Sequence, residues 1–350
     1  CRRMGCVGVA GARPMKPLAV LIPAFNEEAV VSRAIFSAYL SGAVPDDVYV
    51  VDDGSTDRTA EIAWHMNAQV LSTQNHGKAA AIRVGLRLLE GKYERVAILD
   101  ADSAVSEGYI TEMRKAAAKH PDAAVLCGAP RSLPHNWLTA YRAVEYAISL
   151  GIYREAQSLF RAITVAPGCA SVYKVAVLAS LDFTGGTLVE DMDFTIQLHR
   201  LGKEIRYVPD AIVYTQDPRT LRDYIGQIDR WYTGTWQVVR LRRLGKHIQP
   251  IDIEILWLLS EGLLFAGIIP LIPLLVYLFP IPTLIGLALD QLLLFSFSLI
   301  VARREQRLDV VWAFPLFLIP RVLSSVRFLW AFMVSRRFRS FTWYSVRRYT

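Results

Sequence analysis

Two long apolar segments near the C-terminal end constrain the fold of this chain more than any other feature. Residues 255–279 carry one charged side chain, Glu261, and residues 281–302 also carry one, Asp290. Because roughly 20 apolar residues cross the hydrocarbon core of a bilayer, each segment is predicted to form a membrane-spanning helix. An acid inside such a helix is a candidate for function, or for pairing with an arginine of a neighbouring apolar segment.

A third apolar segment, residues 310–335, contains Arg321 and Arg327 and is interrupted by Pro315 and Pro320. Each arginine costs about 2.5–3.5 kcal/mol at the centre of a membrane helix. We expect a third span here, and the alternative is a re-entrant or interfacial segment around Pro320. The membrane region, residues 249–350, is therefore predicted to contain two or three transmembrane helices.

The net charge of +7 comes from the C-terminal end of the chain. Residues 301–350 contain ten arginines, no lysine and two acids, so the remainder is nearly neutral. This distribution favours contact with anionic lipids, and the absence of a basic, aromatic-laced stripe elsewhere argues against nucleic acid. By the positive-inside rule, the loop with Arg303, Arg304 and Arg307 is cytoplasmic. Two spans before that loop place the N-terminal domain in the cytoplasm as well, which predicts a multi-pass protein of the cell membrane.

The region before Gln249 alternates short apolar runs with amphipathic segments. The predicted buried strands are residues 18–22, 48–51, 68–71, 95–99 and 123–127. Helical spacing occurs between them, in residues 27–40, 56–66, 78–89 and 107–119. This alternation predicts an α/β domain over residues 17–248, with a mostly parallel sheet and helices on both faces. Residues 1–16 are an N-terminal extension, and the four cysteines show neither zinc-site nor disulfide spacing.

Polar clusters follow the first two predicted strands, where ligands of open α/β sheets bind. The first cluster includes Pro23, Asn26 and Glu27, and the second includes Asp52 and Asp53. Adjacent carboxylates at a strand end can accept hydrogen bonds from a uracil or a ribose. The alternative is a turn in which Ser55 or Thr56 caps the next helix.

Asp100 and Asp102 follow the predicted strand at residues 95–99. Mg²⁺ or Mn²⁺ binds one or two carboxylates together with phosphate oxygens, so this pair is a candidate site for a metal ion and a nucleoside diphosphate. An Asp-rich turn without bound metal is the alternative.

Two clusters lie at predicted helix starts. Lys78 follows Gly77, and a lysine beside a helix N-terminus suits a diphosphate, although Gly77 is equally suited to an ordinary turn. Glu190 and Asp191 open a helix that extends to about Leu201. Acids in this position stabilise the helix dipole, or one of them serves as a general base that deprotonates an acceptor hydroxyl. One base with direct in-line attack would invert the anomeric configuration.

Gln227, Arg230 and Trp231 share one face of the amphipathic stretch 221–240 because they are spaced i, i+3 and i+4. An arginine can bind a diphosphate with two parallel hydrogen bonds, and an aromatic ring can stack on a sugar. The alternative is a helix in the membrane surface. Both interpretations can hold for the same helix.

The order of these clusters is more specific than any one of them. PAFNEE, VDDGSTD, NHGKA, DAD, VEDMDF and QIDRW follow one another across residues 23–231. This order resembles that of the family 2 glycosyltransferases, in particular the processive membrane synthases of the poly-N-acetylglucosamine, chitin, hyaluronan and cellulose type. The resemblance implies a GT-A fold, a UDP-sugar donor and Mg²⁺ or Mn²⁺.

The resemblance also implies roles for individual residues. On the donor side, Pro23, Asn26, Glu27, Asp52 and Asp53 correspond to the nucleotide-sugar site, Lys78 to the diphosphate-side lysine, and Asp102 with Asp100 to the metal-binding acids. On the acceptor side, Asp191 corresponds to the catalytic base with Glu190 beside it. Gln227, Arg230 and Trp231 correspond to the motif that holds the diphosphate and the acceptor sugar, and Gly168 and Cys169 lie where the family has an acceptor-lining loop. Val189 departs from the family, which usually has Thr before Glu-Asp.

The leading hypothesis is an inverting hexosyltransferase that adds sugars, first of all N-acetylglucosamine from its UDP derivative, to a growing β-linked polysaccharide. Single transfer to a membrane lipid, which yields a glycolipid, is the first alternative. A catalytically inactive membrane protein that only binds a nucleotide-sugar is the second. The sequence leaves open whether a small membrane partner subunit exists.

Overall fold

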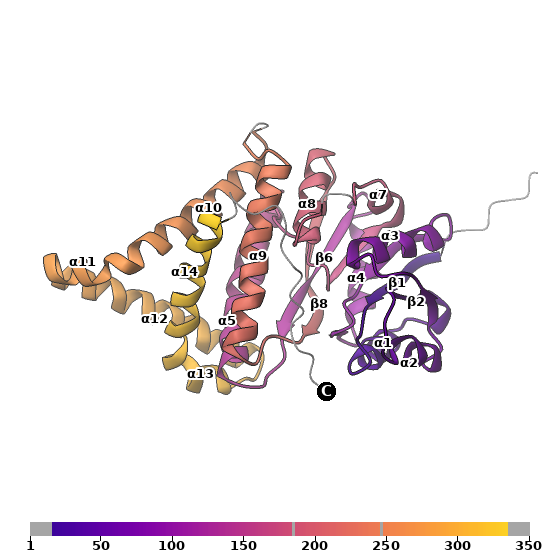
Figure 1. The fold of residues 1–350 in the computed structure, drawn as a ribbon, viewed down its shortest axis with the longest axis horizontal. Helices are drawn as coiled ribbons and strands as arrows, with labels where there is room; N and C mark the ends of the chain where they lie inside the picture. Colours follow the sequence, from indigo (N-terminus) through magenta and orange to yellow (C-terminus); the bar gives the residue numbers. More distant parts are fainter. Residues whose placement is uncertain (1–15, 184–185, 246–247, 335–350) are drawn as a thin grey trace, which may run out of the picture.

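The computed structural model describes residues 16–183, 186–245 and 248–334. The predicted N-terminal extension, apart from Lys16, and the arginines of residues 336–348 lie outside the described residues. Figure 1 shows an α/β domain joined to a group of long helices formed by the C-terminal part of the chain.

The domain is built on one mixed sheet with the strand order β3-β2-β1-β4-β7-β6-β8-β5. β3, β2, β1 and β4 are parallel, β7 is antiparallel to both of its neighbours, β6 and β8 are parallel, and β5 is antiparallel to β8. The strands are β1 (Lys16–Ala24), β2 (Val48–Asp52), β3 (Gln69–Ser72), β4 (Tyr93–Ile98), β5 (Ser103–Val105), β6 (Val125–Ser132), β7 (Ser171–Lys174) and β8 (Ile205–Thr215). The predicted α/β class is confirmed, and the five predicted strands correspond to β1, β2, β3, β4 and β6.

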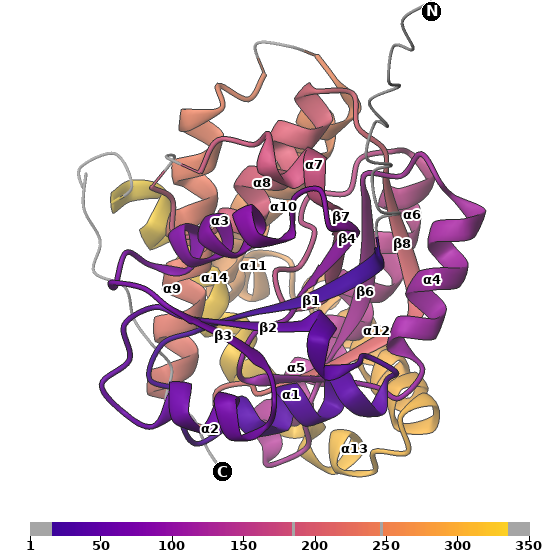
Figure 2. The same cartoon turned by 90° about the vertical axis from the view of Figure 1, so that its right-hand side faces the viewer.

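Helices cover both faces of the sheet because the strands are apolar on both sides. In β1, Leu18, Val20 and Ile22 face one core, whereas Ala19 and Leu21 face the other. Figure 2 shows α3 on one side of β1–β3, and α1 and α2 on the other. The first core is closed by α1 (Val31–Leu40), α2 (Thr59–His65) and α4 (Tyr109–Lys119). The second is closed by α3 (Lys78–Leu89), α7 (Val175–Ala179) and α8 (Glu190–Arg200).

Two further helices connect the domain to the C-terminal helices. α5 (Trp137–Tyr146) follows β6, and α9 (Leu221–Leu241) follows β8. Tyr141 of α5 and Tyr224 of α9 share one apolar cluster with Val310 and Phe317 from the C-terminal part. After α5 the chain continues as a π-helical segment, Ala147–Ile152, and then as α6 (Tyr153–Leu159).

Within the described residues, two helices are long and apolar enough to cross a membrane, as predicted. The first, Pro250–Leu278, consists of α10 (Pro250–Ile268), a 3-10 turn (Ile269–Leu271) and α11 (Ile272–Leu278). The second is α12 (Pro280–Arg304). Together they extend away from the α/β domain as a hairpin (Figure 1).

The third apolar segment is broken rather than continuous. α13 (Asp309–Ala313) with the turn Phe314–Leu316 is bent by 58° relative to α14 (Leu318–Val334). A proline lacks the N–H of the helical ladder and its ring crowds the preceding turn, and Pro315 and Pro320 flank the bend. The segment passes as a third membrane helix only if both pieces are counted as one span.

Several charged side chains of these apolar helices have polar partners. Arg321 donates to both carboxylate oxygens of Asp290, at 2.6 and 2.8 Å. Arg327 pairs with both oxygens of Asp229 on α9. Of the two alternatives for the acids of the apolar segments, pairing with an arginine of the third segment holds for Asp290. The hydroxyl of Tyr153 on α6 donates to Glu261 at 3.5 Å.

Candidate active site

The loops after β1 and β2 are fastened to each other. Asn26 has a positive φ of 55°, and its backbone N–H donates to the Ser55 hydroxyl at 2.9 Å. The Asn26 side-chain oxygen accepts from the N–H of Thr56 at 2.8 Å. The N–H of Glu27 donates to the Thr59 hydroxyl at 2.8 Å. Pro23, in β1, lies opposite Val51 in β2. The structure therefore places the first two polar clusters side by side at the carboxyl ends of neighbouring strands.

Asp52 and Asp53 are both buried, and Asp53 shapes the loop that leads to Lys78. The Asp53 carboxylate accepts from the N–H of Gly77 at 2.7 Å, the N–H of His76 at 3.1 Å and the Thr73 hydroxyl at 3.1 Å. Asp52 accepts from the N–H of Ser55 at 3.0 Å. These bonds give both acids a structural role in the loops, and their predicted contact with uridine remains a prediction.

Lys78 lies at the centre of an ionic cluster that joins three separate loops. Its ammonium group is 2.6 Å from Asp100 Oδ1 and 3.3 Å from Glu190 Oε1. The N–H of Gly168 points toward Asp191 Oδ2 at 3.4 Å, and a Cβ on Gly168 would lie 3.1 Å from the Lys78 nitrogen. Lys78, Gly168, Glu190 and Asp191 line a small cavity with Ile82, Ile98 and Phe194. Its volume is about 10 Å³, which is room for one water molecule. Residues far apart in the sequence thus meet in a closely packed group.

The electrostatics of this cluster suit a base beside a cation. Burial, the largest effect, lowers the pKa of Lys78, but Asp100 and Glu190 raise it above its ordinary value, so Lys78 is charged. Burial and then Glu190 raise the pKa of Asp191, while Lys78 lowers it. A carboxylate with a raised pKa accepts a proton more readily than an ordinary one, as a general base must.

Helix α9 carries the motif formed by Gln227, Arg230 and Trp231 and brings it toward Asp191. Arg230 is one of the groups that lower the pKa of Asp191, which puts its charge near that carboxylate. The Trp231 ring lies 4.7 Å from the guanidinium carbon of Arg142. The side-chain oxygen of Gln227 is buried and has no partner among the described residues. Arg230 thus lies near the candidate base, and Trp231 packs against Arg142.

Cys169 lies among the acids of the cluster. Burial raises the pKa of its thiol well above the ordinary value, and Asp100, Asp102 and Asp191 raise it further. The thiol therefore stays protonated, which suits the lining of a site rather than nucleophilic or metal-binding chemistry.

The candidate metal-binding acids follow β4. Asp102 is buried, and its Oδ1 accepts from the Ser103 hydroxyl at 3.1 Å, whereas Asp100 pairs with Lys78. Across the described residues, no group of three or more His, Cys, Asp or Glu side chains could hold a metal by itself. Two hard carboxylates fit an ion that takes its remaining ligands from phosphate and water, as Mg²⁺ and Mn²⁺ do.

Sequence reasoning missed three polar residues beside this site, namely Arg142, Tyr146 and Asp217. They form a buried cluster against Trp231. The available signal was a lone arginine in a mostly apolar helical stretch, residues 137–148, in which Glu145 is the other charged residue. Such an arginine rarely becomes fully buried without a specific partner.

Comparison with known proteins identifies the family. A family model described as "Glycosyltransferase like family 2" matches residues 14–234, more than half of the chain. The chain belongs to this family. Its mixed sheet with helices on both faces is the GT-A fold, as the motif order predicted.

Named relatives agree with the synthase type that the motifs resemble. The chain is 27% identical over 247 residues to a poly-beta-1,6-N-acetyl-D-glucosamine synthase of Staphylococcus epidermidis, covering 66% of this chain and 59% of that protein. It is 29% identical over 245 residues to an N-acetylglucosaminyltransferase of Rhizobium meliloti, covering 64% and 57%. The chain thus spans less than two thirds of the length of these relatives.

A solved structure shares the fold over most of both chains. A mannosyltransferase from Pyrobaculum calidifontis, in complex with GDP-Man and Mn²⁺, superposes with a TM-score of 0.61. The sequence identity is 19%, and the match covers 90% of this chain and 88% of the other. At this identity the likeness supports the architecture, including the helices that follow the α/β domain.

Proposed function

We propose that this chain is an inverting glycosyltransferase that moves N-acetylglucosamine from its UDP derivative to a growing β-linked polysaccharide. The observation that carries the proposal is the meeting of Lys78, Asp100, Glu190 and Asp191 beside Arg230 of α9. This arrangement combines a cation for a diphosphate with a carboxylate for proton removal. The choice of sugar and of a polymeric product is supported by the names of the relatives.

In the proposed reaction, an acceptor hydroxyl oxygen attacks the anomeric carbon of the donor sugar. The new bond forms as the bond from that carbon to the diphosphate oxygen breaks, and UDP leaves with the bonding electrons. The proton of the hydroxyl passes to the Asp191 carboxylate. Because attack and departure occur on opposite faces of the sugar ring, one displacement inverts the anomeric configuration. The N–H groups of Met192, at 2.8 Å, and Gly168 hold the Asp191 carboxylate in place.

Lys78 and Arg230 are proposed to bind the diphosphate. Both are cations near Asp191, so they would stabilise the negative charge that grows on the leaving group. Asp100 and Asp102 would hold Mg²⁺ or Mn²⁺, which would neutralise further charge on the diphosphate. Asp52, Asp53, Pro23, Asn26 and Glu27 would line the nucleoside side, on loops that already bond to each other.

Trp231, Gln227, Gly168 and Cys169 are proposed to receive the acceptor sugar. An indole ring offers an apolar face on which a sugar ring can stack. The unpartnered oxygen of Gln227 could accept a hydrogen bond from a sugar hydroxyl.

The contacts of α12 support a cytoplasmic domain. Its C-terminal end returns to the α/β domain, where Arg131 pairs with Glu305 at 3.2 Å and Arg307 donates to the carbonyl of Ser132 at 2.9 Å. If the two helices cross a bilayer, the arginine-rich loop after α12 would lie on the same side of it as the domain. The positive-inside rule places such a loop in the cytoplasm, where UDP-sugars would reach the site.

We propose that the third apolar segment does not cross the membrane. α14 lies along α9, with Ser324 bonded to Tyr224 at 2.6 Å. Farther along the same pair of helices, the ring of Phe332 packs on that of Trp236 at 5.0 Å. Two spans and a surface-lying α14 would return the C-terminal end to the side of the α/β domain.

Product sizing tests the proposed reaction. Membranes containing the full chain are incubated with Mg²⁺ or Mn²⁺ and a panel of labelled UDP-sugars, and the products are separated by length. We expect a ladder of oligosaccharides from UDP-N-acetylglucosamine. A single sugar on a lipid would replace the polymerase assignment with single transfer. UDP binding without any product would indicate an inactive nucleotide-sugar-binding protein.

A further inference from the structure

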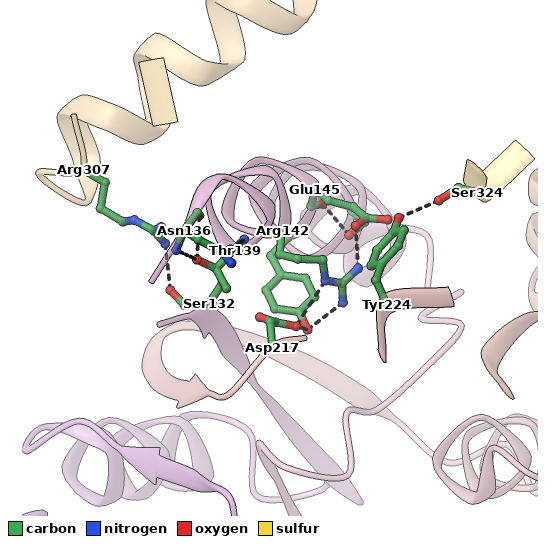
Figure 3. A network of polar contacts seen from close by, with 11 residues as sticks. Ser132, Asn136, Thr139, Arg142, Glu145, Asp217, Tyr224, Arg307 and Ser324 are labelled. Carbon is green, nitrogen blue, oxygen red and sulfur yellow. Dashed lines mark hydrogen bonds and ion pairs between the residues drawn. The ribbon is translucent and has the colours of Figure 1, made fainter. Parts of the chain in front are cut away.

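Arg142 of α5 is an arginine with no direct access to solvent. Its side chain is 0% exposed, and so is that of Asp217, which accepts from Arg142 Nε at 3.2 Å. Arg142 also donates to Glu145 at 2.5 Å and to the Tyr146 hydroxyl at 2.8 Å. Figure 3 shows the guanidinium between Asp217 and Glu145, with Tyr224 and Ser324 close by. This cluster lies between α5, the end of β8 and α9.

The cluster fixes the orientation of the guanidinium plane. Tyr146 donates to the same oxygen of Asp217 at 2.8 Å, so arginine, tyrosine and aspartate close a triangle. Burial raises the pKa of Tyr146 well above its ordinary value, which keeps that hydroxyl protonated and able to donate. With three of its nitrogens bonded, the guanidinium has little freedom to rotate.

Stability alone is a weak reason for such a cluster. Taking ions out of water has a large desolvation cost, and apolar replacements of similar volume are often at least as stable. The cluster nevertheless leaves one buried oxygen of Asp217 without a partner among the described residues. Because this buried cluster costs free energy, we infer that the fixed position of the Arg142 guanidinium has a role other than stability.

The guanidinium of Arg142 lies over the ring of Trp231, which belongs to the proposed acceptor site. Its carbon lies 4.7 Å from the ring of Trp231 and 4.5 Å from the ring of Tyr146. A cation at this distance is attracted to the electron-rich face of an indole and opposes rotation of the ring. The π-helical segment at Ala147–Ile152 begins directly after Tyr146, and π-turns within helices occur frequently at functional sites.

We propose that Arg142 is a positioning residue for the acceptor sugar, because it holds the Trp231 ring in the orientation on which that sugar stacks. This inference rests on the proposed acceptor role of Trp231. Only arginine can donate hydrogen bonds to Asp217 and Glu145 from separate nitrogens while its planar, charged group lies over the indole.

The test compares Arg142→Lys with Arg95→Lys. Arg95 is also buried and bonds to the carbonyls of Ala123 and Pro121, but it lies toward the start of β4, away from Trp231. The full chain is purified with fluorinated tryptophan, and the ¹⁹F signal of Trp231 is assigned by its loss in Trp231→Phe. A short β-linked N-acetylglucosamine oligosaccharide is then titrated, and UDP binding is measured separately.

The wild-type Trp231 signal is expected to shift as the oligosaccharide binds. In Arg142→Lys the free signal should move, and oligosaccharide binding should weaken by about threefold to thirtyfold while UDP binding is unchanged. Arg95→Lys should behave as the wild type. If Arg142→Lys does not fold, Tyr146→Phe removes the hydroxyl shared by Arg142 and Asp217 and should weaken oligosaccharide binding in the same direction.

Three results would overturn the proposal. The first is a ¹⁹F signal of Trp231 that does not shift when the oligosaccharide is added. The second is unchanged oligosaccharide binding in Arg142→Lys and Tyr146→Phe. The third is equal weakening of oligosaccharide binding in Arg142→Lys and Arg95→Lys. A wild-type protein that binds the oligosaccharide but transfers no sugar would instead contradict the proposed function and leave the role of Arg142 standing.

Discussion

Replacing Lys78 by methionine is expected to destabilise the protein and to change how its reaction depends on pH. The substitution keeps an unbranched side chain, shorter by the terminal nitrogen, and leaves Asp100 and Glu190, formerly 2.6 and 3.3 Å from that nitrogen, without their cation. At an effective permittivity of about 20, one pair of unit charges 4 Å apart is worth about 4 kcal/mol. The three side chains are 15–31% exposed, so solvent offsets part of this energy. We therefore expect a loss of about 2 kcal/mol, or roughly 4–8 °C in the melting temperature.

The pH dependence follows from the sign of each effect on Asp191. Burial and Glu190 raise its pKa, and Lys78 lowers it, so the pKa should rise further in Lys78→Met. A general base works only when it is deprotonated. As the pH is lowered, the variant should therefore lose transfer activity at a higher pH than the wild type does. We expect the acid limb to move up by about one pH unit, which corresponds to about 1.4 kcal/mol. The loss of stability should shrink as pH falls, because protonation of the carboxyls removes their repulsion.

The assay measures thermal unfolding and transfer rate across a range of pH for the wild type, Lys78→Met and Lys115→Met. Lys115 pairs with Glu112 at 2.7 Å on the surface, with a side chain 67% exposed, so its replacement should change stability by less than about 0.5 kcal/mol. If Lys78→Met unfolds at the same temperature as the wild type and the acid limb of its pH profile does not move, the ionic cluster does not control the pKa of Asp191.

Two further substitutions test how α9 is held. In Gly234→Ala, the new Cβ would lie 2.8 Å from both methyl groups of Val189. We therefore expect a stability loss of about 1–3 kcal/mol and slower transfer. The control is Gly267→Ala, whose new Cβ would meet nothing within 4 Å. Arg327→Met should lower the melting temperature because Asp229 loses its partner, and Asp229→Leu added to it should restore much of the loss. An Arg327→Met variant as stable as the wild type would show that this ion pair does not fasten α14 to α9.

The strands that sequence could predict are those with continuous apolar runs. Buried parallel strands such as β1 and β4 read as near-continuous hydrophobic stretches, so both were found within a few residues of their ends. β8 was not predicted, because Pro209 and Asp210 interrupt its apolar pattern. The structure accommodates them where the pairing with β6 shifts register between Cys127 and Ala129.

The site was predictable residue by residue, but its internal contacts were not. Lys78 and Asp100 each belong to a motif, yet nothing in those motifs indicates that the two bind each other or that Glu190 joins them. Arg142 belongs to none of the motifs, and its partner Asp217 lies 75 residues away. Ion pairs between loops depend on the packing of the whole sheet, which periodicity and spacing do not describe.

The most direct test of the proposed reaction compares Asp191→Asn with Asp193→Asn. Asp193, on the same helix turn, is also an aspartate, but its carboxylate binds Arg242 at 2.6 Å. We predict that Asp191→Asn lowers the transfer rate by about 10²- to 10⁴-fold and leaves UDP binding intact. Asp193→Asn should lower stability but keep most of the transfer rate per folded molecule. Transfer at the wild-type rate by Asp191→Asn would contradict the assignment of Asp191 as the base.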